Sequence, residues 1–325
     1  MIRHPSISSA ILQKIDTASS ITLVAHIRPD GDAIGSVVGF GLALRAYGKP
    51  VSMAFEETLP QRFRYLDIQN DPAENEGEKL TIALDCADQP RMAKSFADKS
   101  IDINIDHHAT NTQFAAVNYV NDKAAATAEI IVDLLQEWNI PIPTSAADAL
   151  MMGIITDTIG FRTPNTTAHT LYVAAHLMEK GGNLTDTYQQ ALTDVSWEAG
   201  LLWGYALCKL QKEGNIIYTV ITCEDREKAG YTGRDDADLT NFLSSIQDAE
   251  ISILFNQQDE KACKVSWRSR SEVNVATIAA QFGGGGHPAA AGAEIELSMQ
   301  ETQRAVLEAT RNYLRDIHNQ EYLNG

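Results

Sequence analysis

The sequence predicts an α/β protein of two domains, and three observations support this prediction. At the start of the chain, segments of helical periodicity alternate with short apolar runs typical of buried strands, and three more such runs follow before the chain turns helical. A second set of strands and helices follows beyond residue 214. The chain has 325 residues, which is enough for two domains with hydrophobic cores of their own. We therefore expect a doubly wound parallel sheet followed by a smaller α/β domain.

The N-terminal domain is expected to span residues 1–190. Ile7, Ile11 and Ile15 lie four apart, which predicts a helix over 6–18. Pro29 and Gly31 break regular structure after the first strand, so a loop is expected there before the next helix. Strands are expected at 21–25, 51–55, 80–84, 101–105 and 116–120, and an acidic loop at 67–79. Helices are expected at 33–47, 125–138, 146–158 and 185–192, and one more follows the caps Asn165 and Thr166 and ends at 178.

A helical connector is expected over 191–213, and the second domain over 214–325. The apolar runs at 251–256 and 262–268 are close enough in the chain to pair as neighbouring strands. The remaining elements expected in this domain are strands at 215–223 and 293–296 and helices at 238–245, 273–282 and 300–318.

Composition limits the partners and the compartment. The formal net charge of −17 argues against long duplex nucleic acid, although metals and a few arginines can still hold a short anionic substrate. No apolar run reaches the ~18 residues that suggest a membrane span. The four cysteines show no CxxC spacing, which favours reduced thiols in a cytoplasmic protein and gives no reason to expect a zinc knuckle.

Carboxylates and imidazoles gather where the predicted strands and one helix end. The carboxyl ends of parallel strands meet at one edge of an open sheet, where ligands bind. Any one of these residues alone is more often a loop cap or a solvated side chain, but together they indicate a metal site. Asp30 and Asp32 are two apart, so extended backbone would direct them to the same side. The candidate ligands are His26, Asp30, Asp32, Asp85, His107 and Asp157.

This set of oxygen and nitrogen donors suits Mn(II) and, less uniquely, Fe, Co or Mg. Four carboxylates and two imidazoles are enough for two divalent ions that share a bridging carboxylate. Two such ions can activate a water molecule and stabilise the leaving oxygen of a phosphate ester. The sequence therefore favours phosphoester hydrolysis at this edge.

A glycine run, Gly283 to Gly286, precedes His287. Alone it is as easily a flexible hinge as a binding loop. Here it stands between an apolar helix and a stretch of small residues, and glycines let backbone N–H groups approach a phosphate closely. Arg268 and Arg270, just after a predicted strand, offer guanidinium groups for a phosphate, although a solvated strand end explains Arg270 equally well.

These stretches together resemble the DHH phosphoesterase superfamily. The matching pieces in the first half are His26-x-x-x-Asp30-x-Asp32, the strand-ending Asp85, Asp106-His107-His108, and Asp157-Thr158-x-x-Phe161. The second half resembles the DHH-associated C-terminal domain through Ser266-Trp267-Arg268-Ser269, Asn274-Val275 and the glycine run with His287. The size and the domain pairing are similar to the nanoRNase/pAp phosphatase (NrnA-type) group.

The resemblance implies an enzyme that hydrolyses very short RNA, including linear dinucleotides, to mononucleotides. It also implies a phosphatase activity on 3′-phosphoadenosine 5′-phosphate (pAp), an active site in the interdomain cleft, and a homodimer.

The resemblance also implies roles for individual residues. One metal would take His26, Asp30 and Asp85, and the other Asp32, Asp85, His107 and Asp157. His108 would contact the scissile phosphate or protonate the leaving oxygen, with Asp106 orienting the ligands. The substrate's terminal phosphate and sugar would meet Arg268, Ser269, Gly284, Gly285, Gly286 and His287.

Three alternatives remain at this point. The first is a phosphodiesterase that acts on cyclic-di-AMP or linear dinucleotides in signalling, which the sequence cannot separate from the leading hypothesis. The second is a nucleotide-binding regulator without catalysis, and the third is a scaffold with a relic metal site. The complete set of candidate ligands argues against the second, and the intact glycine-His stretch against the third.

Overall fold

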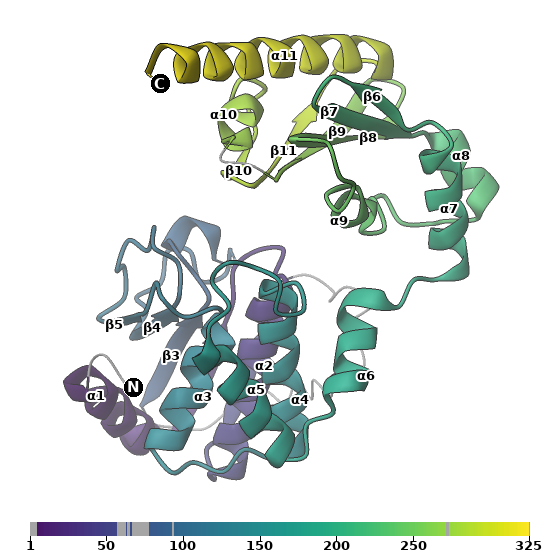
Figure 1. Ribbon diagram of the computed structural model, residues 1–325. Helices are drawn as coiled ribbons and strands as arrows, with labels where there is room; N and C mark the ends of the chain where they lie inside the picture. The colour runs from purple at the N-terminus through teal and green to yellow at the C-terminus, as the bar shows by residue number, and fades with distance from the viewer. Residues whose placement is uncertain are drawn as a thin grey trace. The chain divides into compact units, whose positions relative to one another are not determined.

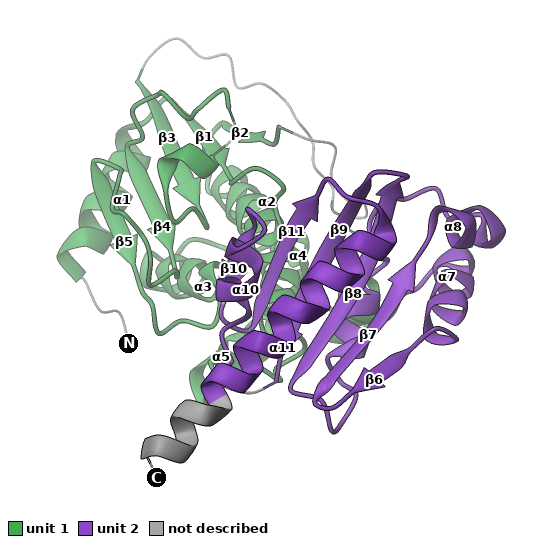
Figure 2. Cartoon of the chain, turned by 90° about the horizontal axis from the view of Figure 1, so that it is seen from above, with its two compact units in different colours: residues 1–194 green, residues 195–325 purple. Residues whose placement is uncertain are grey.

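A computed structural model describes residues 5–56, 63, 66, 78–92, 94–270 and 273–324. The chain forms two compact units, Met1–Asp194 and Val195–Gly325, which are coloured separately in Figure 2. The predicted α/β class is confirmed in both units. The acidic loop predicted at 67–79 lies, up to residue 77, outside the described residues.

The first unit is built on a five-stranded parallel sheet in the order β2-β1-β3-β4-β5. In this order the chain reverses direction across the sheet between β1 and β3, the topological switch point where open α/β sheets bind ligands. The strands are β1 (Ser20–Val24), β2 (Val51–Ala54), β3 (Lys79–Leu84), β4 (Ile103–Asp106) and β5 (Val117–Val120).

Helices cover one face of this sheet (Figure 1). Ile82 and Ile105 of the sheet share a core with Phe40, Ile131 and Leu150 of the helices, and all five are buried. The helices of the unit are α1 (Pro5–Thr17), α2 (Gly31–Ala46), α3 (Thr127–Glu137), α4 (Thr144–Asp157), α5 (Ala168–Glu179) and α6 (Leu184–Tyr188), with a 3₁₀ turn at Gln89–Arg91 and a π-helix at Gln189–Thr193.

Helices α2 and α4 approach each other closely because glycines face the contact. A Cβ added to Gly35 would meet the carbonyl oxygen of Ala149, and one added to Gly153 would lie 2.9 Å from Asp32 Oδ1. The N-terminus of α2 therefore lies beside the C-terminus of α4, as the contact of Gly31 with Thr156 also shows. This packing brings the first turn of α2 next to Asp157.

The second unit holds a six-stranded mixed sheet in the order β10-β11-β9-β8-β7-β6. Phe255 and Trp267, both fully buried, lie in the core on the face covered by α10 and α11. The strands are β6 (Gln211–Glu213), β7 (Ile216–Ile221), β8 (Ile251–Asp259), β9 (Ala262–Ser269), β10 (Gly285–His287) and β11 (Ala290–Ile295), and the helices are α7 (Trp197–Leu207), α8 (Cys223–Ala229), α9 (Leu239–Leu243), α10 (Val275–Ala280) and α11 (Met299–Asn324).

The structure differs from the prediction at the start of this unit. The helix expected up to residue 213 ends at Leu207, and a short strand, β6, follows it. Leu202 and Ala206 of α7 are buried in a core with Leu254 of β8, so α7 packs as part of the second unit. The predicted domain boundaries at 190 and 214 stay predictions. None of the helices described is long and apolar enough to cross a membrane.

Candidate metal centre

The six predicted ligands converge at the carboxyl edge of the parallel sheet. His26 follows β1, Asp85 follows β3, and His107 follows β4. Asp30 and Asp32 stand at the start of α2, and Asp157 is the last residue of α4. Their ligand atoms form two groups, and within each group the atoms lie within 4.8 Å of one another. The first group is His26, Asp30 and Asp85, and the second is Asp32, His107 and Asp157.

His107 is surrounded by three carboxylates. Its Nε2 lies 3.5 Å from Asp157 Oδ2, 3.7 Å from Asp85 Oδ1 and 3.9 Å from Asp32 Oδ2. These separations are too long for hydrogen bonds. Because metal–ligand bonds are ~2.1 Å long, ligands of a common ion sit roughly 3–4 Å apart, as these atoms do. Nδ1 lies 3.4 Å from the carbonyl oxygen of Ala124, which favours the tautomer that leaves Nε2 as the donor to a metal.

His26 has the same arrangement. Its Nδ1 lies 2.8 Å from the carbonyl oxygen of Ile27, and its Nε2 lies 3.8 Å from Asp85 Oδ2. The exposed Asp30 caps α2 by accepting hydrogen bonds through Oδ1 from the backbone N–H groups of Asp32 and Ala33. This cap fixes the carboxylate of Asp30 beside His26 and Asp85.

Asp32 lies in the first turn of α2 and is 1% exposed. Its carboxylate accepts hydrogen bonds from the backbone N–H groups of Thr127 (2.6 Å) and Ala128 (3.0 Å), the first residues of α3. Asp32 thus accepts hydrogen bonds from N–H groups in the first turn of α3, which have no acceptor within that helix. The expectation of extended backbone through Asp30 and Asp32 was wrong, because only Asp30 is extended, as the cap of α2, and Asp32 belongs to the helix itself.

Asp85 is 2% exposed and has a positive φ of 58°, which is uncommon for a residue other than glycine. Its backbone N–H donates to the carbonyl oxygen of Ile105 on the neighbouring strand (3.0 Å). Its Oδ1 accepts a hydrogen bond of 2.9 Å from the hydroxyl of Thr127, and Oδ2 faces His26. Asp85 therefore lies between the two groups of ligands, as a bridging carboxylate must.

Three carboxylates of this cluster, those of Asp32, Asp85 and Asp157, have raised pKa values. Burial raises the pKa of Asp85 well above its ordinary value, and the charges of Asp32 and Asp30 raise it further. Burial, followed by the same two charges, raises the pKa of Asp157 to about 8. Burial also raises the pKa of Asp32, which the nearby His107 opposes. Divalent cations would stabilise the ionised forms, so the donor set fits such ions.

Asp106 holds His108 in a fixed orientation. Fully buried, it accepts hydrogen bonds through Oδ1 from His108 Nδ1 (2.7 Å) and through Oδ2 from Asn111 Nδ2 (2.6 Å). Burial alone would raise the pKa of Asp106, but the hydrogen bond and charge of His108 lower it below its ordinary value. Burial alone would lower the pKa of His108, but the hydrogen bond and charge of Asp106 raise it.

His108 also forms a third group of potential ligands with Asp85 and His107. Its Nδ1 lies 3.6 Å from Asp85 Oδ1 but 2.7 Å from Asp106 Oδ1, so this nitrogen is committed to Asp106. Thr127 and Asn111, which hold Asp85 and Asp106, are not among the residues predicted for the site. Thr127 lies near the predicted helix start at 125 and Asn111 follows the Asp106-His107-His108 motif, but a threonine or an asparagine at such a position does not by itself indicate a site residue.

The residues predicted to bind substrate lie in the second unit. Arg268 and Ser269 end β9, and Gly284 precedes the edge strand β10. The glycine run was expected as a loop, but Gly285 to His287 pair antiparallel with β11. Small residues permit this close pairing, since a Cβ on Gly286 would meet the carbonyl oxygen of Ala290. The side chain of His287 lies outside the described part of the structure.

A parallel sheet with a cluster of Asp and His at its carboxyl edge defines an α/β protein with the ligands for divalent metal ions. Residues 20–154 match the DHH family, N-terminal domain, and residues 196–316 match the DHHA1 domain. The chain belongs to the DHH family, which confirms the resemblance seen in the sequence.

A relative from Thermus thermophilus, the bifunctional oligoribonuclease and PAP phosphatase NrnA, is 34% identical over 314 residues, or 90% of each chain. An exopolyphosphatase-related protein of Bacteroides fragilis shares the fold, with a TM-score of 0.84, 23% identity and 96% of both chains covered. RecJ of Thermus thermophilus in complex with Mn²⁺ has a TM-score of 0.53 at 13% identity, over 94% of this chain and 54% of its own.

Proposed function

We propose that the protein is a metal-dependent phosphoesterase. It hydrolyses short RNA oligonucleotides and linear dinucleotides to mononucleotides and removes a phosphate from pAp. The observation that carries the proposal is the position of His107 Nε2 among three carboxylates, at separations typical of ligands that share an ion. The substrate class is that named for the NrnA relative.

Two divalent ions, which we propose to be Mn²⁺, would be held by these residues. His26, Asp30 and Asp85 would bind one ion, and Asp32, Asp85, His107 and Asp157 the other, with Asp85 between them. When bound, such a pair lowers the pKa of a water nucleophile and stabilises the charge on the leaving oxygen.

His108 is the proposed proton donor to the leaving oxygen. Asp106 holds the Nδ1 proton and raises the pKa of the ring, so His108 is protonated over a wider pH range than an ordinary histidine. Asn111 in turn holds Asp106 through a second hydrogen bond. Asp106 is thus a positioning residue, and His108 a catalytic one.

The second unit would supply contacts to the terminal phosphate and sugar. The guanidinium of Arg268 keeps its charge even though burial lowers its pKa. Ser269 provides a hydroxyl, and the backbone N–H groups of an edge strand are open to an anion. The proposed contacts are Arg268, Ser269, Gly284, Gly285, Gly286 and His287. A homodimer stays a prediction.

A substrate panel tests the proposal. RNA of two to five nucleotides, a 24-mer, pAp, cyclic-di-AMP and pyrophosphate are incubated with Mn²⁺ and the wild-type protein, Asp85→Asn or the exposed control Asp98→Asn. We expect turnover of short RNA and pAp by the wild type and the control and at least a 1000-fold loss in Asp85→Asn. Preference for cyclic-di-AMP would favour signalling turnover instead. Nucleotide binding without any turnover would contradict the proposal.

A further inference from the structure

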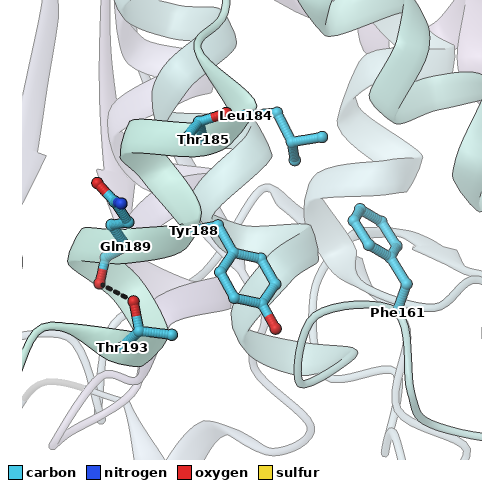
Figure 3. A pocket seen from close by; sticks show the side chains of 6 residues that line it. All are labelled: Phe161, Leu184, Thr185, Tyr188, Gln189 and Thr193. Atoms are coloured by element: carbon cyan, nitrogen blue, oxygen red, sulfur yellow. Dashed lines mark hydrogen bonds between the residues drawn. The ribbon is translucent and has the colours of Figure 1, made fainter.

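A pocket of about 510 Å³ lies in the first unit. This volume is in the range of sites that bind small molecules. In Figure 3 the rings of Tyr188 and Phe161 flank one space and Leu184 closes it on a third side. The complete lining is Phe161, Leu184, Thr185, Tyr188, Gln189 and Thr193.

Two unusual backbone features meet at this pocket. Ile159, Gly160 and Phe161 have consecutive positive φ angles of 46°, 68° and 65°. Positive φ is costly for Ile and Phe, and such strain gathers at functional sites. On the opposite side, Gln189–Thr193 form a π-helix, another feature that is rare and frequent at functional sites.

The pocket adjoins the metal centre along the chain. Phe161 follows the metal-ligand candidate Asp157 by four residues, so their Cα atoms are at most about 14 Å apart. The segment between them is fixed to the end of α4, because the backbone N–H of Gly160 donates to Ile155 and that of Phe161 donates to the hydroxyl of Thr158. Tyr188 touches this segment, since a Cβ on Gly160 would overlap its ring.

The side chains that line the pocket suit the base of a nucleotide better than its phosphate. None of the six lining side chains is charged, so the pocket has nothing to neutralise a phosphate. Two aromatic rings and a leucine suit a flat ring system, and the hydroxyl of Tyr188 suits its polar edge. Aromatic side chains that stack on bases are a common means of binding single-stranded nucleic acid without sequence preference.

We infer that this pocket holds one nucleobase of the substrate while the scissile phosphate lies at the metal centre. This inference rests on the proposed function and adds a base subsite to it. It explains how a strongly acidic protein holds a short anionic substrate, because part of the affinity comes from contacts with the nucleobase and not from contacts with the phosphates.

The test compares three substrates, the diribonucleotide ApA and the two isomers of the same phosphodiester that lack one base or the other. KM and kcat are measured for the wild type, Tyr188→Leu, Tyr188→Phe and the exposed control Tyr172→Leu. We expect one abasic isomer to show a KM at least tenfold higher than ApA with the wild type. Tyr188→Leu should reduce this ratio to within about twofold of unity, and both Tyr188→Phe and Tyr172→Leu should keep it.

The outcomes separate the inference from the proposed function. Turnover of ApA and both abasic isomers with equal KM would overturn the base subsite and leave the phosphoesterase intact. An equal rise of KM for all substrates in Tyr188→Leu would also overturn it, because a structural role alone predicts that result. Absence of turnover of ApA by the wild type would overturn the proposed function, and the base subsite with it.

Discussion

The hydroxyl of Thr127 donates a hydrogen bond of 2.9 Å to Asp85 Oδ1. The backbone N–H of the same residue donates one of 2.6 Å to Asp32 Oδ2. Thr127 is fully buried and begins α3, so a single rigid residue fixes two of the carboxylates that face His107. Such supporting contacts hold the ligands in place, and their removal commonly lowers metal affinity about 10–100-fold.

Replacement of Thr127 by Val should weaken metal binding. Valine keeps the shape and the backbone N–H but removes the donor to Asp85, so the carboxylate loses its fixed orientation. We expect Mn²⁺ affinity to fall about 10–100-fold in calorimetric titrations. Thr127→Ser, which keeps the hydroxyl, should stay within about threefold of the wild type. Equal affinity of the Val variant and the wild type would show that Thr127 has no positioning role.

The metal-free protein should lose stability as the pH rises. The folded-state pKa of Asp157 is about 8, above the ordinary value of an unfolded aspartate. Between these values the folded state binds more protons than the unfolded state, so the free energy of unfolding falls with rising pH. We expect a loss on the order of 2 kcal/mol between pH 5 and pH 8 in urea titrations with a chelator.

Asp157→Asn provides the control for this pH dependence. The amide does not titrate, so the fall in stability between pH 5 and pH 8 should become shallower, while the buried Asp85 still contributes part of it. Saturating Mn²⁺ should reverse the trend in the wild type, since metal binding requires ionised carboxylates. A metal-free wild type that gains stability over this range would contradict the assigned pKa directions.

Asp106→Asn should slow turnover without emptying the metal centre. The substitution removes the charge that raises the pKa of His108 and weakens the hydrogen bond that orients its ring. We expect kcat to fall about 10²–10³-fold. Because His108 would then lose its proton at a lower pH, the alkaline limb of the pH–rate profile should move to lower pH. Mn²⁺ stoichiometry should match that of the wild type. Loss of bound metal would instead identify Asp106 as a support of the ligands.

Gly35→Ala should destabilise the first unit. The new Cβ would meet the carbonyl oxygen of Ala149 in α4, and backbone cannot move aside cheaply. We expect a loss of about 1–3 kcal/mol in chemical unfolding. Gly200→Ala is the matched control, because it is also helical but its Cβ meets nothing within 4 Å, so it should be neutral or slightly stabilising. Equal effects of the two substitutions would contradict the close α2–α4 contact.

The strands of the first unit could be predicted because each is an apolar run bounded by polar or breaking residues. The carboxyl ends of parallel strands share one edge, which places Asp85 and His107 together. Among the described residues, however, an α-helix intervenes only between β1 and β2, so the parallel pairing of β3 with β4 could not be derived from a helical crossover. The position of Asp157 could not be derived in this way. It depends on the contact of α2 with α4 that glycines such as Gly35 and Gly153 permit, and a sequence pattern does not show which helix a glycine will face.

Elements of the second unit were missed for different physical reasons. β10 consists of glycines and a histidine, which carry no strand propensity, and it forms because the small residues of β11 allow close pairing. Helix α8 carries a signal that could have found it, the capping box of Thr222 and Asp225. Thr127 acts through contacts with Asp85 and Asp32, which are 42 and 95 residues away in the chain, so no local pattern could reveal its role. Asn111 lies only five residues from its partner Asp106, but the hydrogen bond between them depends on the conformation of the loop after β4.

The most direct test of the metal centre is an anomalous difference map from crystals of the Mn²⁺-loaded protein. We predict two peaks about 3.5–4 Å apart at the carboxyl edge of the parallel sheet. One should lie among His26, Asp30 and Asp85 and the other beside His107, with a carboxylate oxygen of Asp85 near both. A single peak, or Mn²⁺ bound elsewhere while this edge shows none, would contradict the two-metal account.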